Sequence, residues 1–313
     1  MRYSRRERPG FALLAVLWVM MGVVTLGLAT SLVARRAVAG AHNRVQLRRA
    51  AWMAEECVER ARAAIDEVLT AQANSASERG GGWSRLDAAV ATSPLLRTSK
   101  CDVSLRPLGS AVDIGSADAE MLSQLLAGLA MPVRRADSLV DALLDWRDRD
   151  DVARPLGAER DWYQAHGRLP PRNAPLADIR ELARVRGFEA LQGLDSVLTL
   201  EPGRIALNHA PLTVVAALPG FTPEAVARMV EHRVRSAPVT DLLAFAGQLS
   251  PSARQALLAR YADLVRFTTI EPDGWILTAR AKSGAPAVTA VLEVRLVRAG
   301  NRAAIVRRRT WIA

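Results

Sequence analysis

The chain has few of the residues from which enzymatic sites are built. Its 313 residues include only two cysteines and four histidines, and His42, His166, His209 and His232 are dispersed along the sequence. We find no Gly-x-Ser-x-Gly motif, no phosphate-binding loop and no pair of ligands at zinc spacing. We therefore predict that the protein is not an enzyme.

Proline and glycine are absent from residue 41 to residue 73, so nothing in this stretch interrupts a helix. Just before it, residues 11–34 are 24 consecutive uncharged and mostly apolar residues. A helix of that length measures about 36 Å and can cross a bilayer, whereas the apolar part of a signal peptide is shorter. The sequence predicts a transmembrane helix over residues 11–34.

The same helix is expected to continue beyond the membrane to about Leu69. Apolar residues recur there at intervals of three or four: Leu47, Ala51, Ala54, Val58, Ala61, Ile65 and Val68. This period places them on one face, which we expect to pack on a soluble domain. The basic leader MRYSRRERPG favours a cytoplasmic N-terminus, although Arg35 and Arg36 beyond the span reduce the charge asymmetry.

The rest of the chain changes pattern twice. Residues 100–114 have a strand-like pattern, and residues 116 to about 264 have a largely helical one. Residues 274–281, 287–298 and 303–312 then alternate as three strands of an antiparallel meander. The expected fold class is α+β: a long N-terminal helix packed on a small antiparallel sheet, interrupted by a large helical insertion.

The leader ends in Gly10 and is followed by Phe11. This resembles the class III signal of type IV pilins and pseudopilins, in which a prepilin peptidase cleaves after the glycine and methylates the new N-terminus. The resemblance implies processing between Gly10 and Phe11. Most of these proteins have Glu five residues into the mature chain, where this sequence has Ala15. That absence is similar to minor pseudopilin K of type II secretion systems, the subunit at the pseudopilus tip.

An acidic segment strengthens this resemblance. It reads DWRDRDD at 145–151, GAE at 157–159, Tyr163, NAPL at 173–176, EL at 181–182 and VRG at 185–187, an order similar to the central signature of the K family. The resemblance implies structural calcium here, with Asp148, Asp150, Asp151 and Glu159 as candidate ligands and Asp161 as a further one. From the residues alone, salt bridges to the neighbouring arginines are the alternative.

The helical block contains a weak internal repeat. IGSA at 114–117 aligns with LNHA at 207–210, and LVDALLDWR at 139–147 aligns with AVARMVEHR at 225–233. This resembles the two SAM-like, helix-hairpin-helix-like subdomains of the K family. It implies a pilin-like part over 35–115, helical subdomains over 116–201 and 202–265, and the closing strands over 266–313.

The segment LPGFTPEA at 218–225 supports a rival hypothesis, because it is similar to a helix-hairpin-helix turn that binds DNA without sequence preference. In such a turn, backbone N–H groups approach a phosphate. Here Thr222 replaces the second glycine and Glu224 places a negative charge where the phosphate would lie. These changes favour a helix pair used for packing.

The two cysteines, Cys57 and Cys101, could form a disulfide if the soluble part is periplasmic. The alternative is two separately buried thiols.

Together, the resemblance implies a single-pass inner-membrane protein whose soluble domain lies in the periplasm. It would act at the pseudopilus tip, helping to initiate assembly and the export of folded proteins. Its partners would be pseudopilins I and J, the major pseudopilin and the prepilin peptidase, with no nucleic acid. The alternatives are a membrane-anchored helix-hairpin-helix protein for DNA uptake and a minor pilin of a type IV pilus.

Overall fold

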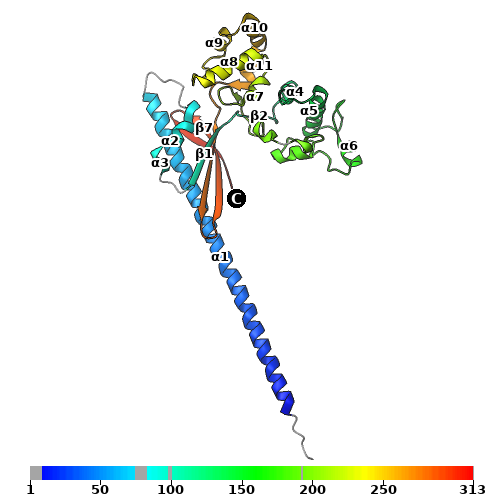
Figure 1. Ribbon diagram of the computed structural model, residues 1–313, viewed down its shortest axis with the longest axis vertical. Coiled ribbons are helices and arrows are strands. Elements are labelled where there is room, and N and C mark those ends of the chain that lie inside the picture. Colours follow the sequence, from blue (N-terminus) through cyan, green and yellow to red (C-terminus); the bar gives the residue numbers. More distant parts are fainter. Residues whose placement is uncertain (1–8, 75–82, 98–100, 192, 313) are drawn as a thin grey trace, which may run out of the picture.

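The computed structural model describes residues 9–74, 83–97, 101–191 and 193–312. One long helix, α1 (Pro9–Asn74), starts at the lower end of the molecule, and a sheet packs beside its second half (Figure 1). A helical lobe joins the far end of the sheet (Figure 1). The predicted uninterrupted helix is confirmed, and it ends at Asn74, slightly beyond the predicted Leu69.

The remaining elements follow α1 in a consistent order. The helices and 3-10 turns are η1 (Trp83–Arg85), α2 (Leu86–Thr92), α3 (Pro94–Arg97), α4 (Ala119–Gly128), α5 (Val133–Arg147), α6 (Arg160–Ala165), η2 (Ile179–Arg184), η3 (Phe188–Ala190), η4 (Leu194–Ser196), α7 (Leu212–Ala216), α8 (Pro223–Val234), α9 (Leu242–Gly247), α10 (Pro251–Ala259) and α11 (Tyr261–Phe267). The strands are β1 (Cys101–Pro107), β2 (Val112–Asp113), β3 (Leu198–Thr199), β4 (Ile205–Ala206), β5 (Thr268–Thr269), β6 (Trp275–Ser283), β7 (Val288–Ala299) and β8 (Arg302–Ile312).

The main sheet has the strand order β1-β6-β7-β8, and every pair in it is antiparallel. The three C-terminal strands therefore confirm the predicted meander. One face of the sheet covers α1, where Val58 and Ile65 of the predicted apolar stripe are buried against Leu277 and Val294. The apolar face of α1, which has a helical period, and the apolar face of the strands, which has a two-residue period, thus pack together in one layer.

The helical lobe is inserted between β1 and β6, which are neighbours in the sheet. Pro107 is the register partner of Trp275, and the Leu108 N–H donates to the Gly274 carbonyl at 2.9 Å. The chain leaves the sheet and returns to it at adjacent positions. The segment 100–114, which has a strand-like sequence throughout, therefore forms two separate strands. β1 belongs to the main sheet, whereas β2 belongs to the lobe.

The lobe has its own hydrophobic core. Its buried residues, from Val112 to Leu264, form one contiguous cluster that includes both helical segments and is separate from the core between α1 and the sheet. A short parallel strand pair closes each segment, β2 with β3 around the first and β4 with β5 around the second.

The junction between lobe and sheet is tightly packed. Gly109 has a φ of +77°, and a Cβ there would lie 1.9 Å from the Arg204 carbonyl oxygen, so only glycine fits. Arg204 in turn pairs with Asp273 at 2.6 Å. Trp83 and Trp275 each donate an indole N–H across this region, to the carbonyls of Pro272 and Trp83 respectively.

Candidate metal centre and membrane span

The acidic segment folds into a loop between the end of α5 and the start of α6. Asp148 is the residue that follows the last turn of α5, and Glu159 precedes the first turn of α6. Their carboxylates meet that of Asp150, so that one oxygen from each of the three residues lies within 4.8 Å of the others. This spacing suits a shared cation.

Several oxygens at this place are buried and have no hydrogen-bond partner. They are Asp148 Oδ1, both carboxylate oxygens of Glu159, and Asn173 Oδ1. Glu159 as a whole is only 4% exposed. Buried oxygens are normally hydrogen-bonded, and a carboxylate that lacks both a donor and a counter-charge is costly. All four atoms would be satisfied by one oxygen-seeking cation.

The pKa of Glu159 also indicates that a positive charge is missing at this place. Burial, followed by the negative charges of Asp145, Asp148 and Asp151, raises its pKa from 4.5 to about 7. Without a cation, the Glu159 carboxylate therefore takes up a proton at a clearly higher pH than an ordinary glutamate. A bound divalent ion would supply the missing positive charge.

Arg154 neutralises the other side of the loop. Its guanidinium lies 2.6 Å from Asp145 Oδ1 and 2.6 Å from Asp148 Oδ2, and its backbone N–H also donates to Asp145. Asp145 is fully buried. Salt bridges thus form at Asp145, at one oxygen of Asp148 and, through Arg160, at Asp151. They leave the second Asp148 oxygen and both Glu159 oxygens without a hydrogen-bond partner.

Glycine at 157 is required by this arrangement. A Cβ on Gly157 would lie 1.9 Å from Asp145 Oδ2, so no larger residue fits beside the buried carboxylate. Steric fit thus explains why position 157 of the GAE sequence is glycine, and Glu159 of the same sequence supplies the buried carboxylate.

The structure brings together only part of the predicted ligand set. Asp148, Asp150 and Glu159 form the group, whereas Asp151 and Asp161 lie outside it. Asp151 instead accepts a hydrogen bond from Asn173 Nδ2 at 2.9 Å. Asp161 lies exposed in the first turn of α6.

Asn173, which the sequence interpretation did not include among the candidate ligands, lies next to this loop. Its φ of +50° is in the left-handed region, which asparagine tolerates better than most residues. Its Nδ2 donates to the Asp150 carbonyl and to Asp151, and its Oδ1 is buried without a hydrogen-bond partner. The sequence feature that could have identified it is the asparagine that begins the NAPL sequence at 173–176. The resulting set of carboxylate and amide oxygens, without nitrogen or sulfur, fits Ca²⁺.

The N-terminal part of α1 is long and apolar enough to span a membrane, and its side chains from Leu13 to Ala39 are exposed. This is compatible with a single-pass anchor. Gly10 and Phe11 lie in the helical backbone, but their side chains and residues 1–8 are outside the described part of the chain. The cleavage site stays a prediction.

The predicted disulfide also stays a prediction. Cys57 is buried on α1 beneath the sheet, at 4% exposure. Cys101 begins β1, but its side chain lies outside the described residues.

The hairpin that suggested DNA binding is packed inside the lobe. Gly220 has a φ of +79°, and a Cβ there would lie 2.7 Å from the Ala256 carbonyl oxygen of α10. Thr222 caps α8 through the Ala225 N–H, and Glu224 accepts hydrogen bonds from the backbone and hydroxyl of Ser250. The Gly220 backbone is therefore packed against α10, while Pro223 and Glu224 remain exposed.

Comparison with known proteins agrees with the resemblance seen in the sequence. Residues 105–202 match the family model described as type II secretion system (T2SS), protein K. Type II secretion system protein K of Dickeya chrysanthemi is 32% identical over 108 residues, which cover 34% of this chain and 28% of that protein.

The fold matches at larger scale. A chain in the crystal structure of the GspK-GspI-GspJ complex from the enterotoxigenic Escherichia coli type 2 secretion system superposes with a TM-score of 0.62 at 17% identity. The match covers 87% of this chain and 99% of that one. Residues 105–202 are thus similar to protein K of type II secretion systems, and the overall fold is similar to that of a chain from the GspK-GspI-GspJ complex.

Proposed function

We propose that the protein is the minor pseudopilin at the tip of a type II secretion pseudopilus, where it helps to initiate assembly and the export of folded proteins. The observation that carries the proposal is the insertion of the acidic, K-like segment between β1 and β6 of a unit made of one long helix and a sheet. Ala15 supports the tip position, because a subunit with no neighbour ahead of it needs no intramembrane glutamate.

The proposed location is the inner membrane, with α1 as a single-pass anchor and the sheet and lobe in the periplasm. The peptidase would cleave between Gly10 and Phe11 and methylate the new N-terminus. Oxidation in the periplasm would allow the Cys57–Cys101 disulfide to form.

The proposed partners are the I and J pseudopilins, the major pseudopilin and, during processing, the prepilin peptidase. The similar chain from Escherichia coli comes from a GspK-GspI-GspJ complex. The chain would act by assembly and not as an enzyme.

The lobe is proposed to consist of two related helical repeats. Each repeat opens and closes with a short parallel strand pair, and each contains an arginine bonded to two carbonyls of its first turn, Arg147 in the first and Arg233 in the second.

The acidic loop is proposed to hold structural Ca²⁺ through Asp148, Asp150, Glu159 and Asn173. Asp151, with its carboxylate bonded to Asn173, would position that ligand, and Asp161 would complete the sphere only through water. Binding would fix the α5–α6 connection rather than perform chemistry.

The full chain, purified in detergent, can be mixed with the I and J pseudopilins of the same organism and examined by size-exclusion chromatography with light scattering. A one-to-one-to-one complex is expected. A duplex DNA of random sequence serves as the second ligand. Absence of the complex together with salt-sensitive DNA binding would replace this proposal with DNA uptake.

A further inference from the structure

The charge on α1 changes abruptly beyond the apolar run. Residues 9–54 contain five arginines and no aspartate or glutamate. The arginines are Arg35, Arg36, Arg44, Arg48 and Arg49, here called the juxtamembrane collar, and all five are exposed. None of them forms an ion pair with any residue that the structure describes.

The next part of α1 differs from the collar. From Glu55 onward acidic residues appear, and both arginines there are paired: Arg60 with Glu56 at 2.5 Å and Arg62 with Glu59 at 2.7 Å. Unpaired positive charge is therefore confined to the part of the helix nearest the apolar run.

The collar surrounds the helix instead of lying on one side. At about 100° per residue, Arg35 and Arg36 point in different directions, and Arg44 lies about 180° around the axis from Arg35. A protein partner that packs against one face of α1 would leave some of these arginines without counter-charge. A surface that encircles the helix meets all of them.

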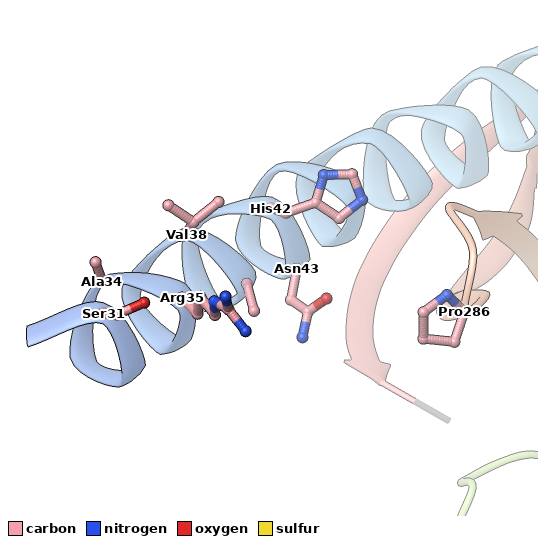
Figure 2. A pocket seen from close by; sticks show the side chains of 8 residues that line it. Ser31, Ala34, Arg35, Val38, His42, Asn43 and Pro286 are labelled. Atoms are coloured by element: carbon pink, nitrogen blue, oxygen red, sulfur yellow. The ribbon is translucent and has the colours of Figure 1, made fainter. Parts of the chain in front are cut away.

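The base of the soluble unit lies at the same level. A pocket of about 580 Å³ is bounded by Arg35, His42 and Asn43 of α1 and by Pro286 of the β6–β7 turn (Figure 2). The turn is held on α1 because the Ser283 hydroxyl donates to Gln46 at 2.7 Å. Lys282 next to the turn is exposed and adds positive charge.

The axial distances divide the collar into two tiers. Arg35 and Arg36 directly follow the apolar run, and the headgroup layer beyond the hydrocarbon is about 5–8 Å thick, so these two lie among the phosphates. Arg44 begins about 15 Å from Ala34 along the helix. The Arg44 charge can still attract the lipid phosphates, because its side chain reaches towards them and the remaining gap is about one Debye length, roughly 8 Å at physiological ionic strength.

We propose that the juxtamembrane collar binds anionic phospholipids of the leaflet from which α1 emerges, with Arg35 and Arg36 on the phosphates. The proposal rests on α1 spanning a membrane. It adds a lipid-binding surface that would orient the soluble unit on the bilayer before assembly.

The test uses the full chain in nanodiscs that contain spin-labelled phosphatidylglycerol or spin-labelled phosphatidylcholine in a phosphatidylcholine background. The measured quantity is the fraction of each label that the protein immobilises. We expect preference for the anionic label, up to roughly fivefold for each arginine at the surface, and its decline at high salt. The double variant Arg35→Gln/Arg36→Gln should lose most of the preference, and a triple glutamine variant at 44, 48 and 49 a smaller part.

The matched control is Arg134→Gln/Arg135→Gln, two adjacent exposed arginines at the start of α5 in the lobe, which should leave the preference unchanged. Equal immobilisation of both labels by the wild-type chain would overturn the proposal. So would an unchanged preference in the Arg35/Arg36 variant. If that variant instead loses its complex with the I and J pseudopilins while keeping the lipid preference, the arginines contact protein. Failure of the chain to enter nanodiscs would refute the span itself.

Discussion

Arg147 and Arg233 make the same hydrogen bonds at equivalent places in the two helical segments of the lobe. Arg147, at the end of α5, donates to the carbonyls of Ile114 and Ala117. Arg233, near the end of α8, donates to those of Leu207 and Ala210, at 2.8 and 2.6 Å. Each arginine ties the entry of its segment to its longest helix.

Replacing either arginine with methionine should destabilise the lobe. The change keeps much of the side-chain volume but leaves two partly buried carbonyls without a donor, which we expect to lower the free energy of unfolding by about 2–4 kcal/mol. Chemical denaturation measures the change. Arg134→Met, on the exposed side of α5, should stay within about 0.5 kcal/mol of wild type. Equal effects at 134 and 147 would contradict the assigned role.

Calcium should raise the midpoint of thermal unfolding, and a chelator should reverse the effect. A ligand at one hundred times its dissociation constant stabilises a protein by about 2.7 kcal/mol. Glu159→Gln should weaken calcium binding by roughly tenfold or more, measured by titration calorimetry. Glu189→Gln, which changes an exposed partner of Arg168, is the control. If calcium does not change the midpoint of thermal unfolding of the wild-type protein, the proposed calcium site is wrong.

The same variant should have the opposite effect without metal. At pH 8 the Glu159 carboxylate, whose pKa is raised to about 7 by burial and neighbouring aspartates, is ionised and unpaired. Glu159→Gln removes that charge, so the metal-free variant should be more stable than metal-free wild type above pH 7. The difference should shrink as the pH falls towards 4.5, the ordinary glutamate value. Denaturation in chelator at several pH values measures it.

Gly157→Ala should destabilise the acidic loop by steric conflict. The added methyl group would lie 1.9 Å from Asp145 Oδ2 and 3.2 Å from the Asp141 carbonyl, so the buried ion pair with Arg154 must move. A cost of about 2–3 kcal/mol is expected. Gly247→Ala is matched to it, because a Cβ there meets nothing within 4 Å. A neutral Gly157→Ala would show that Asp145 is free to move.

Stability should fall in mild acid because of His209. Burial, reinforced by Arg233, lowers the pKa of this histidine despite the opposing charge of Asp87, and its Nε2 is buried without a partner beside Trp275. The unfolded chain therefore binds the proton more tightly than the folded one. The contribution is fully present above about pH 6.5 and is lost as the pH falls towards the lower folded value.

His209→Gln should flatten this part of the pH profile of unfolding, whereas His166→Gln, at an exposed position on the lobe, should leave it unchanged. An identical slope in wild type and His209→Gln would show that the junction does not sense protonation there.

The spacing of apolar residues was sufficient to predict the helix and strands that bury one face. The intervals between Ala54, Val58, Ala61 and Ile65 predicted the side of α1 that lies under the sheet, and alternation predicted β6, β7 and β8. The pairing of β1 with β6 was not predictable in the same way. It depends on where the lobe's two ends meet, at Leu108 and Gly274, and no short-range pattern encodes that meeting.

The same distinction applies to the candidate metal site. Asp148, Asp150 and Glu159 are close in sequence, and the resemblance identified them. Asn173 joins them because the chain beyond α6 turns back at a left-handed residue and bonds to the Asp150 carbonyl. A ligand contributed by such a return depends on the path of the loop, so a count of spacings within the acidic run cannot reveal it.

The register partnership of Pro107 and Trp275 has a structural consequence. Since these residues face each other on adjacent antiparallel strands, a tight turn could join them directly, and β1 and β6 would then form an ordinary hairpin. Because the two cores are separate, a change inside the lobe leaves the packing between α1 and the sheet intact as long as the junction at Gly109 and Arg204 is kept. The lobe is therefore an insertion whose interior can change independently of the helix and sheet that carry it.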